Sequence, residues 1–266
     1  MRAMPGWLKN AARRILPDSL LVPIVAIRER RLSHRLNKQW QVDSLSERLF
    51  KTFGTRVLSG PFAGLVLPEA VACEHVGPYL MGVYEHELHS TLAELPRQRF
   101  SQVVNVGAKF GYYGAGLAKL LGAPVTAFDV DPWARQMTRE TANRSGVGQL
   151  VSIESMCTRE YLAELPDHSL VVIDCDGCEM HLMAPPLPAG LRRATIIVEV
   201  HEMFESGAGH KLKGWLGETH DVREIGSSDD VVAAPVDLSA FNEHDRTMAT
   251  KEIRPHQSWL VCTPKV

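Results

Sequence analysis

The chain has 266 residues, of which 45% are hydrophobic and 23% are charged, and its formal net charge at pH 7 is −2. This composition is typical of a globular protein with one sizeable core, and the near-zero charge argues against a partner that is nucleic acid. The five cysteines are an odd number in a chain long enough to fold without disulfides. We therefore expect reduced thiols and a cytoplasmic location.

The first 60 residues carry an excess of positive charge. Residues 1–60 hold 12 Lys and Arg against 4 Asp and Glu. Apolar residues recur at helical spacing from Trp7 to Leu16, which predicts a basic amphipathic helix, and the apolar run Leu20–Ile27 is shorter than the ~20 residues that span a membrane. This N-terminal helical extension either contacts an anionic membrane surface or packs on its own domain or on a partner subunit, such as a second copy of the chain.

Residues 61–266 are expected to form one α/β domain. Near its start, a helical pattern begins at Tyr84 and ends before Pro96. We expect this helix to pack over the mouth of a cofactor pocket, with Tyr84 and Glu85 turned toward the cofactor.

The segment that follows has a strand-helix-strand pattern. Two short apolar runs, Gln102–Val106 and Val125–Phe128, predict buried parallel strands, and the periodic segment Tyr112–Leu121 predicts the helix between them. Glycines follow the first strand, and Asp129 follows the second. In such a unit the glycines let a cofactor approach the backbone and the acid binds the ribose hydroxyls. We therefore expect an adenosine-type cofactor in a half-domain at about residues 100–180.

The glycine spacing restricts the kind of cofactor. The glycines at positions 107, 111, 114 and 116 do not match the G-x-G-x-x-G of dinucleotide-binding turns, and the turn lacks the lysine and serine of a P-loop. This disfavours a nicotinamide-dependent oxidoreductase. Asn-Val-Gly-Ala followed by Phe-Gly-Tyr-Tyr resembles the first motif of class I S-adenosylmethionine methyltransferases.

Strands and helices continue to alternate along the rest of the chain. Asp131 and Pro132 predict a helix start, with Asp131 as the N-cap. The apolar runs that predict further strands are Leu150–Ile153, Leu170–Ile173, Ala194–Val200, Val222–Ile225 and Trp259–Cys262. The whole pattern predicts a Rossmann-like, mostly parallel sheet with helices on both faces.

Two central strands end in acidic residues. Asp174 and Asp176 follow one strand, and Glu199 and His201 end the next. Because ligands of open α/β sheets lie beyond the carboxyl ends of the strands, we expect these side chains to point into one crevice. The catalytic candidates are Asp174, Glu199 and His201. His201 is the preferred general base because the unperturbed pKa of histidine lies near working pH.

The same strand ends offer ligands for a divalent metal. Asp176, Glu199 and His201 are candidate ligands for Mg²⁺, which would relieve repulsion between the carboxylates. The alternative that we favour has no metal, so that Asp174 faces the cofactor, Glu199 bonds to backbone amides and His201 works alone. The C-x-x-C that starts at Cys175 lacks the second ligand pair of a zinc site, and its acidic neighbours disfavour reactive thiols.

Four segments in order resemble the FkbM-type S-adenosylmethionine-dependent methyltransferases. They are NVGAKFGYYGAGLA, VTAFDVDP, VVIDCDGCEMHLM and TIIVEVHE. The resemblance covers roughly residues 84–201, and Asn105, Lys109 and Asp176 differ from the residues that many members have. It implies a seven-stranded Rossmann-like sheet and methylation of a hydroxyl on a sugar, lipid, glycan or polyketide-type small molecule.

The resemblance also implies how S-adenosylmethionine is bound. The residues implied are Asn105, Gly107, Gly111, Asp129, Glu154, Ser155 and Asp174. The glycine turn would lie under the amino acid part of the cofactor, Asp129 would bind the ribose, Glu154 or Ser155 would lie near the adenine, and Asp174 would lie beside the methyl group. The alternative is a Rossmann-type protein that binds the cofactor without turnover and is held at a membrane or partner by its basic N-terminus.

Overall fold

One seven-stranded sheet organises the chain. The computed structural model describes residues 37, 42–228, 232–254 and 256–265, so the predicted helix at Trp7–Leu16 and the apolar run Leu20–Ile27 lie outside the described residues. Within the described part, no helix has the length and apolar character needed to cross a membrane.

The strand order is β3-β2-β1-β4-β5-β7-β6. The strands are β1 (Gln102–Val106), β2 (Val125–Phe128), β3 (Val151–Glu154), β4 (Ser169–Ile173), β5 (Thr195–Val200), β6 (His220–Gly226) and β7 (Ser258–Pro264). Strands β1 to β5 pair in parallel, and β7 runs antiparallel to both β5 and β6. The predicted seven-stranded, mostly parallel sheet is therefore confirmed. The order reverses between β1 and β4, which is where open α/β sheets bind ligands.

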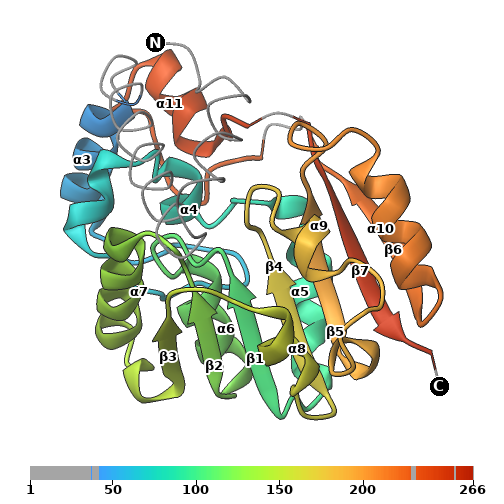
Figure 1. The fold of residues 1–266 in the computed structure, drawn as a ribbon. Coiled ribbons are helices and arrows are strands. Elements are labelled where there is room, and N and C mark those ends of the chain that lie inside the picture. Colours follow the sequence, from blue (N-terminus) through green and yellow to red (C-terminus); the bar gives the residue numbers. More distant parts are fainter. Residues whose placement is uncertain (1–36, 38–41, 229–231, 255, 266) are drawn as a thin grey trace, which may run out of the picture.

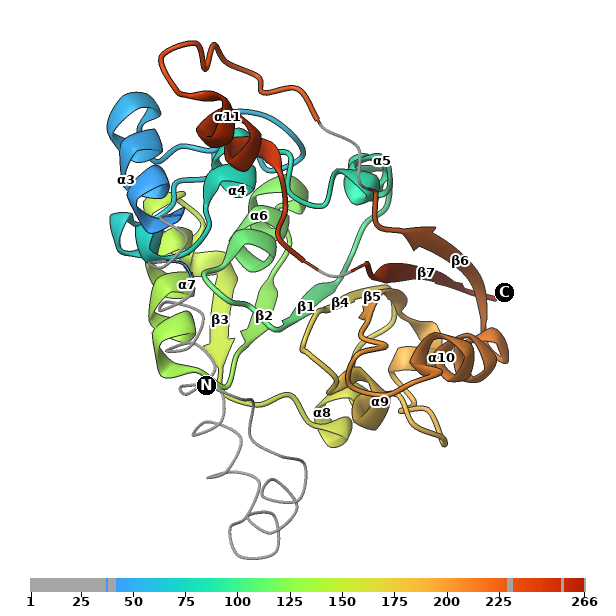
Figure 2. The same ribbon diagram turned by 90° about the horizontal axis from the view of Figure 1, so that it is seen from above.

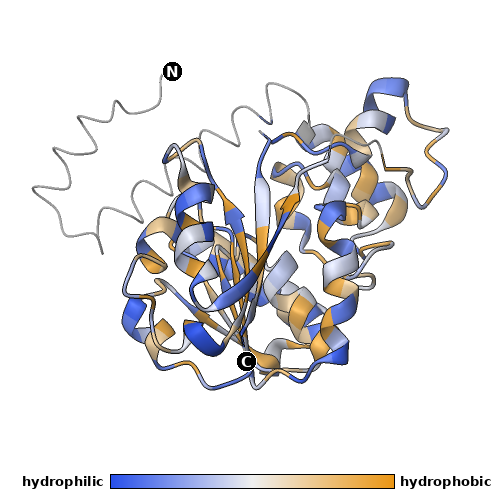
Figure 3. Cartoon of the chain, turned by 90° about the vertical axis from the view of Figure 1, so that its right-hand side faces the viewer, coloured by the Kyte–Doolittle hydropathy of each residue, from blue (hydrophilic) through white to orange (hydrophobic). Residues whose placement is uncertain are grey.

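Helices cover both faces of the sheet (Figures 2 and 3). One face carries α5 (His89–Glu94), α6 (Tyr112–Leu121) and α7 (Pro132–Arg144), and the other carries α8 (Arg159–Ala163), α9 (Glu179–Leu182) and α10 (Ala208–Gly217). Alternate residues of β1 enter the two cores, Val103 on the α6 side and Val104 on the α10 side. This alternation is what the two-sided burial of a parallel strand requires.

A helical cap lies at the upper end of the α6 face (Figure 1). It consists of α3 (Val42–Phe53), α4 (Gly77–Met81) and α11 (Glu243–Thr250), which come from distant parts of the chain and pack on one another. Short 3₁₀ helices complete the structure: η1 (Glu69–Cys73), η2 (His86–Leu88), η3 (Leu95–Arg97), η4 (Gly148–Leu150) and η5 (Leu191–Arg193). The segment after α11 leads back from the cap toward β7, and its Arg254 contacts Glu199 in β5.

The helix expected from Tyr84 onward begins later than predicted. Glu85 has a left-handed backbone with φ of 49°, and regular α-helix starts only at His89. The backbone N–H of Glu85 donates to the Glu252 carboxylate at 2.7 Å, which holds this turn. The helical spacing was therefore a poor guide here, because a contact with a residue far along the chain sets the conformation of Glu85.

Candidate functional site

The predicted site residues gather at one end of the sheet. Gly107, Asp129 and Asp174 directly follow β1, β2 and β4, while Glu154 ends β3 and His201 follows β5. Because these five strands are parallel, their carboxyl ends form one border of the sheet, which we call the carboxyl edge. The crevice expected from the sequence therefore has its polar side chains in one place.

The glycines of the turn after β1 are required by contacts within the protein. Gly107 has φ of 87°, and a Cβ on it would lie 1.5 Å from the carbonyl oxygen of Asp174. Gly111 has φ of 84°, and its Cβ would lie 2.9 Å from Cα of Thr138. Close approach of backbone segments thus explains both glycines without a ligand.

Asn105 is buried in β1 with its amide group unpaired. Its exposure is 1%, and neither Oδ1 nor Nδ2 has a hydrogen-bond partner among the described residues. The amide faces α6, where a Cβ on Gly114 would lie 3.2 Å from Oδ1. A buried amide without a partner costs about 1–3 kcal/mol, so this position calls for a ligand or an ordered water.

Asp129 is positioned by two backbone amides. Its Oδ2 accepts from the N–H of Lys109 and its Oδ1 from the N–H of Asp131, both at 2.8 Å. Burial raises the pKa of Asp129 to about 6 although these amides oppose the shift. Each carboxylate oxygen has a second lone pair, so the group can still accept from ribose hydroxyls. Beside it, Glu154 and Ser155 are exposed at the end of β3, and the Glu154 carbonyl accepts from the Asp129 N–H at 3.2 Å.

Four carboxylates surround the buried ring of His201. Nε2 lies 3.4 Å from Asp174 Oδ1, 3.5 Å from Asp176 Oδ1 and 3.3 Å from Glu199 Oε2. On the opposite side of the ring, Nδ1 lies 3.1 Å from Glu179 Oε1. The structure thus brings together the three predicted catalytic residues and adds Glu179, which is fully buried.

The charge of this cluster changes the role of His201. Burial alone would lower the pKa of His201, but the surrounding carboxylates outweigh it and raise the pKa to about 12. The imidazole therefore keeps its proton at neutral pH, and the premise that its pKa is unperturbed is wrong. The ring is also only 1% exposed, whereas the Asp174 side chain is 29% exposed. Of the three predicted catalytic residues, Asp174 is the one that a ligand in the crevice can reach.

Asp174 and Glu199 interact closely. Burial and the neighbouring charge of Asp174 raise the pKa of Glu199 to about 8. Asp174 shifts in the opposite direction: burial would raise its pKa, but hydrogen bonds with His201 and Glu199 lower it below the ordinary value. Two carboxyl groups whose pKa values are pushed apart in this way can divide one proton between them. The expected bond from Glu199 to backbone amides is replaced by contacts with His201 and Arg254.

The proposed magnesium ligands are only partly assembled. The residues whose ligand atoms lie within 4.8 Å of one another are Asp174, Glu199 and His201, so Asp174 stands where Asp176 was expected. Asp176 is 77% exposed at its side chain. Mg²⁺ prefers an all-oxygen ligand set, and the protonated imidazole already supplies positive charge here. The donor set does not favour Mg²⁺, and we place no metal at this cluster.

Arg254 was missed by the sequence analysis. Its Nη1 lies 3.0 Å from Glu199 Oε1 and 3.3 Å from Glu85 Oε1. Glu85 is fully buried, and its carboxylate contacts Arg254 and the hydroxyl of Tyr113. The carboxylate of Glu85 is held by these two residues, and its contact with a cofactor stays a prediction. Tyr84 stacks on Tyr79 with ring centroids 3.8 Å apart.

Cys175 and Cys178 form a disulfide in the turn after β4. Reduced thiols were expected from the sequence. The structure differs because Asp176 and Gly177 both have positive φ, which folds the turn so that the two Cα atoms lie 5.5 Å apart. Among the described residues, Cys73, Cys157 and Cys262 take part in no disulfide.

Glu179 and Arg254 were not predicted as site residues, and a sequence motif marks only one of them. Glu179 lies in the segment VVIDCDGCEMHLM, one of the four that resemble the FkbM-type proteins, so that segment contained it. Arg254 lies in an irregular segment after α11, and neither a motif nor a periodic pattern marks it.

A cavity of about 310 Å³ lies away from these residues. It lies between the α5–η3 segment and strands β5, β6 and β7, and its lining includes Thr91, Asp221 and Arg223. None of the candidate site residues lines it.

Comparison with known proteins does not assign the chain to a family. No protein-family model matches it, and no curated protein matches it. TrmN from Thermus thermophilus shares 16% identity over 69% of this chain with a TM-score of 0.44, and this chain covers only 48% of TrmN, about half its length. A Klebsiella pneumoniae protein assigned as an O-methyltransferase shares 14% identity over 85% of this chain and 99% of its own, with a TM-score of 0.48. An rRNA methylase from Streptococcus thermophilus shares 13% identity over 67% of this chain and 97% of its own, with a TM-score of 0.47. Likeness of this degree identifies no family, and the fold rests on the sheet itself.

Proposed function

We propose that the chain is an S-adenosylmethionine-dependent methyltransferase of the FkbM type that methylates a hydroxyl group of a sugar, lipid or polyketide-type small molecule. The observation that carries the proposal is that Asp129 and the carboxylates around His201 lie at the carboxyl ends of neighbouring strands, with the unpaired amide of Asn105 one residue before the end of β1. These residues come from the segments that resemble the FkbM-type proteins.

The residues of the carboxyl edge fit the proposed cofactor. Asn105 offers an unpaired buried amide, and Asp129 offers free lone pairs for hydroxyl groups. When bound, the cofactor supplies a methyl group on a positively charged sulfonium. The carboxylates at the ends of β4 and β5 outnumber the cations beside them, so their negative potential favours a positive charge at this edge.

Asp174 is the proposed acceptor of the substrate proton. Methylation of the hydroxyl oxygen would release the hydroxyl proton, so the site needs a group that accepts it. Among the three predicted catalytic residues, Asp174 is the ionised one that a substrate can reach, and we assign it this role. His201 donates toward Asp174 and holds it in place, and most of the rate enhancement comes from positioning the two reactants.

The loop after β5 suggests an acceptor with an apolar part. Met203 and Phe204 are 55% and 50% exposed directly after His201. Phe204 also borders the turn after β4, because a Cβ on Gly177 would lie 3.0 Å from Cβ of Phe204. Exposed apolar side chains beside a reactive carboxylate favour a lipid or polyketide-type acceptor over a bare sugar.

A methyl-transfer assay tests the proposal. The full chain is incubated with S-adenosylmethionine labelled in the methyl group and with lipid, polyketide-type and sugar hydroxyl acceptors. We expect transfer to one class, and a loss of roughly 10²–10⁴-fold in Asp174→Asn, as for removal of a general base. The matched control is Asp176→Asn in the same turn, which should keep most of the activity. Full activity in Asp174→Asn would remove the base assignment, and cofactor binding without transfer to any class would favour the non-catalytic alternative.

A further inference from the structure

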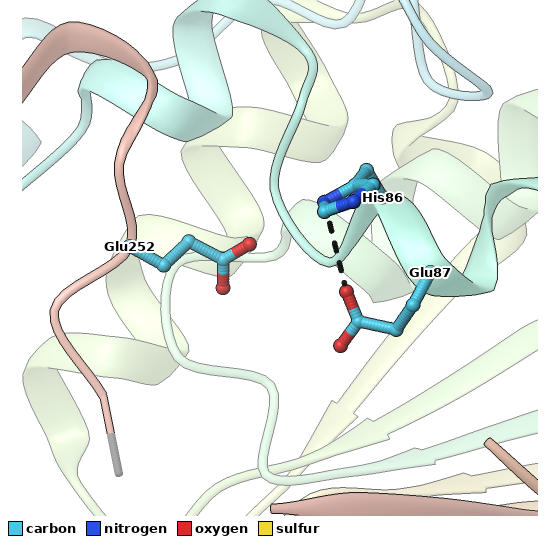
Figure 4. A group of neighbouring side chains, drawn as sticks. All are labelled: His86, Glu87 and Glu252. Atoms are coloured by element: carbon cyan, nitrogen blue, oxygen red, sulfur yellow. Dashed lines mark ion pairs between the residues drawn. The ribbon is translucent and has the colours of Figure 1, made fainter. Parts of the chain in front are cut away.

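A second group of side chains converges beside the carboxyl edge and is separate from the His201 cluster. His86 and Glu87 lie at the start of η2, and Glu252 lies in the segment after α11. The three side chains point toward one another (Figure 4). Each offers one ligand atom, and these atoms all lie within 4.8 Å of one another.

Glu87 has a buried oxygen that nothing satisfies. Its side chain is 5% exposed, and Oε2 accepts no hydrogen bond from any residue in the described part of the chain. The other oxygen, Oε1, accepts from Nη2 of Arg254. The imidazole Nδ1 of His86 lies 3.8 Å from Oε2, which is an ion-pair distance beyond hydrogen-bond range. The gap between this buried carboxylate oxygen and the imidazole nitrogen therefore leaves room for a third partner that binds both.

Several carboxyl groups surround a single cation next to this group. Arg254 is in ion-pair contact with four carboxylates, those of Glu85, Glu87, Glu199 and Glu252. Glu252 uses Oε1 to accept from the Glu85 N–H, and its Oε2 lies 2.9 Å from Nε of Arg254. Several carboxyl groups close to one guanidinium are costly to bury unless protons or further cations offset their charge.

We propose that His86, Glu87 and Glu252 bind a divalent transition metal of the zinc type. An imidazole nitrogen with two carboxylate oxygens is a ligand set that Zn²⁺ accepts, with water in the fourth position, whereas Mg²⁺ and Ca²⁺ prefer oxygen alone. Ligand atoms about 2.1 Å from a tetrahedral metal lie about 3.4 Å apart, so the group has to close by roughly 1 Å. His86 is 24% exposed at its side chain, which leaves an entry path.

The metal ties together two segments that are distant in sequence. It joins η2 to the segment that carries Arg254, whose Nη1 lies 3.0 Å from Glu199 at the end of β5. Its role is structural: it neutralises the carboxylates around Arg254 and fixes this segment across the carboxyl edge. The proposal does not depend on the methyltransferase function.

Metal titration of the full chain tests the site. The chain is freed of metal with a chelator, dialysed, and titrated with Zn²⁺ by calorimetry and with Co²⁺ by visible absorption. We expect one metal ion per chain, a higher unfolding temperature with metal, and a Co²⁺ spectrum without the near-ultraviolet band of a cysteine ligand. His86→Ala and the isosteric Glu252→Gln should each weaken binding at least tenfold.

Two matched variants make the outcome decisive. His168→Asn removes an exposed histidine, and Asp174→Asn alters the His201 cluster; both should leave metal affinity unchanged. Equal affinity in His86→Ala, a loss of binding in Asp174→Asn, or no binding to the unaltered chain would each overturn the proposal.

Discussion

At the scale of single residues, His201 is a buried cation. Its two ring nitrogens face carboxylates on both sides, with Glu179 at Nδ1 and Asp174 and Glu199 at Nε2. A histidine in these surroundings holds neighbouring acids in place and does not remove a proton from a substrate. We therefore propose Asp174, which is more exposed than His201 and Glu199, as the proton acceptor.

The stability of the chain should depend on pH through His201. Its folded pKa of about 12 lies above the ordinary 6.5, so its contribution is complete below pH 6.5 and is lost as pH rises toward 12. We expect His201→Asn to be less stable than the unaltered chain at pH 6.5, and the gap to narrow above that pH by up to about 1.4 kcal/mol per pH unit. Urea unfolding at pH 6.5, 8 and 9.5 measures this, with the exposed His168→Asn as control. A gap that does not change with pH would contradict the account.

At the scale of elements, the turns after β1 and β4 are locked together. Gly107 allows the first turn to approach the carbonyl of Asp174, so the cofactor side and the catalytic side of the carboxyl edge share one backbone contact. A change in the first turn therefore displaces Asp174.

Alanine at Gly107 should lower the free energy of unfolding much more than alanine at Gly122, a glycine with the same type of backbone conformation. Gly107 and Gly122 both have positive φ, but a Cβ on Gly122 meets nothing within 4 Å. Gly122→Ala should cost about 1–2 kcal/mol for the left-handed backbone alone. Gly107→Ala adds the clash and should cost at least about 2 kcal/mol more. Urea unfolding of both variants checks this. An equal loss of unfolding free energy in the two variants would show that the contact between Gly107 and Asp174 is not tight.

The regular elements were predictable because local signals define them. The limits of β1, α6 and β2 match the predicted ranges to the residue, since glycines and short apolar runs mark their ends. The turn at Glu85 was not predictable, because Glu252, 167 residues away, holds its backbone.

At the scale of the whole molecule, the candidate site is assembled from distant segments. The strand ends that supply Asp129, Asp174 and Glu199 follow from the order of apolar runs and acids. Arg254 does not, because it reaches Glu199 only after the chain has passed through β6 and the helical cap. The resemblance to FkbM-type proteins ends near residue 201 and gave no information on that last segment.

The basic N-terminal segment adds a prediction for the whole chain. If residues 1–60 contact a membrane through charge, the chain should float with anionic lipid vesicles and be released as salt rises. Flotation assays at low and high salt measure this. Equal flotation with neutral vesicles would remove the electrostatic explanation, and flotation with neither would favour a helix packed on protein.

Calorimetric titration with S-adenosylhomocysteine and with NAD tests most directly the central claim, a cofactor site at the carboxyl edge. We predict one S-adenosylhomocysteine per chain, no binding of NAD, and a loss of about 1–3 kcal/mol in Asp129→Ala, which removes the ribose acceptor. Near-ultraviolet circular dichroism verifies that the variant is folded, and Asp221→Ala, exposed on β6, is the control. Unchanged affinity in folded Asp129→Ala, or binding of NAD in place of S-adenosylhomocysteine, would contradict the account.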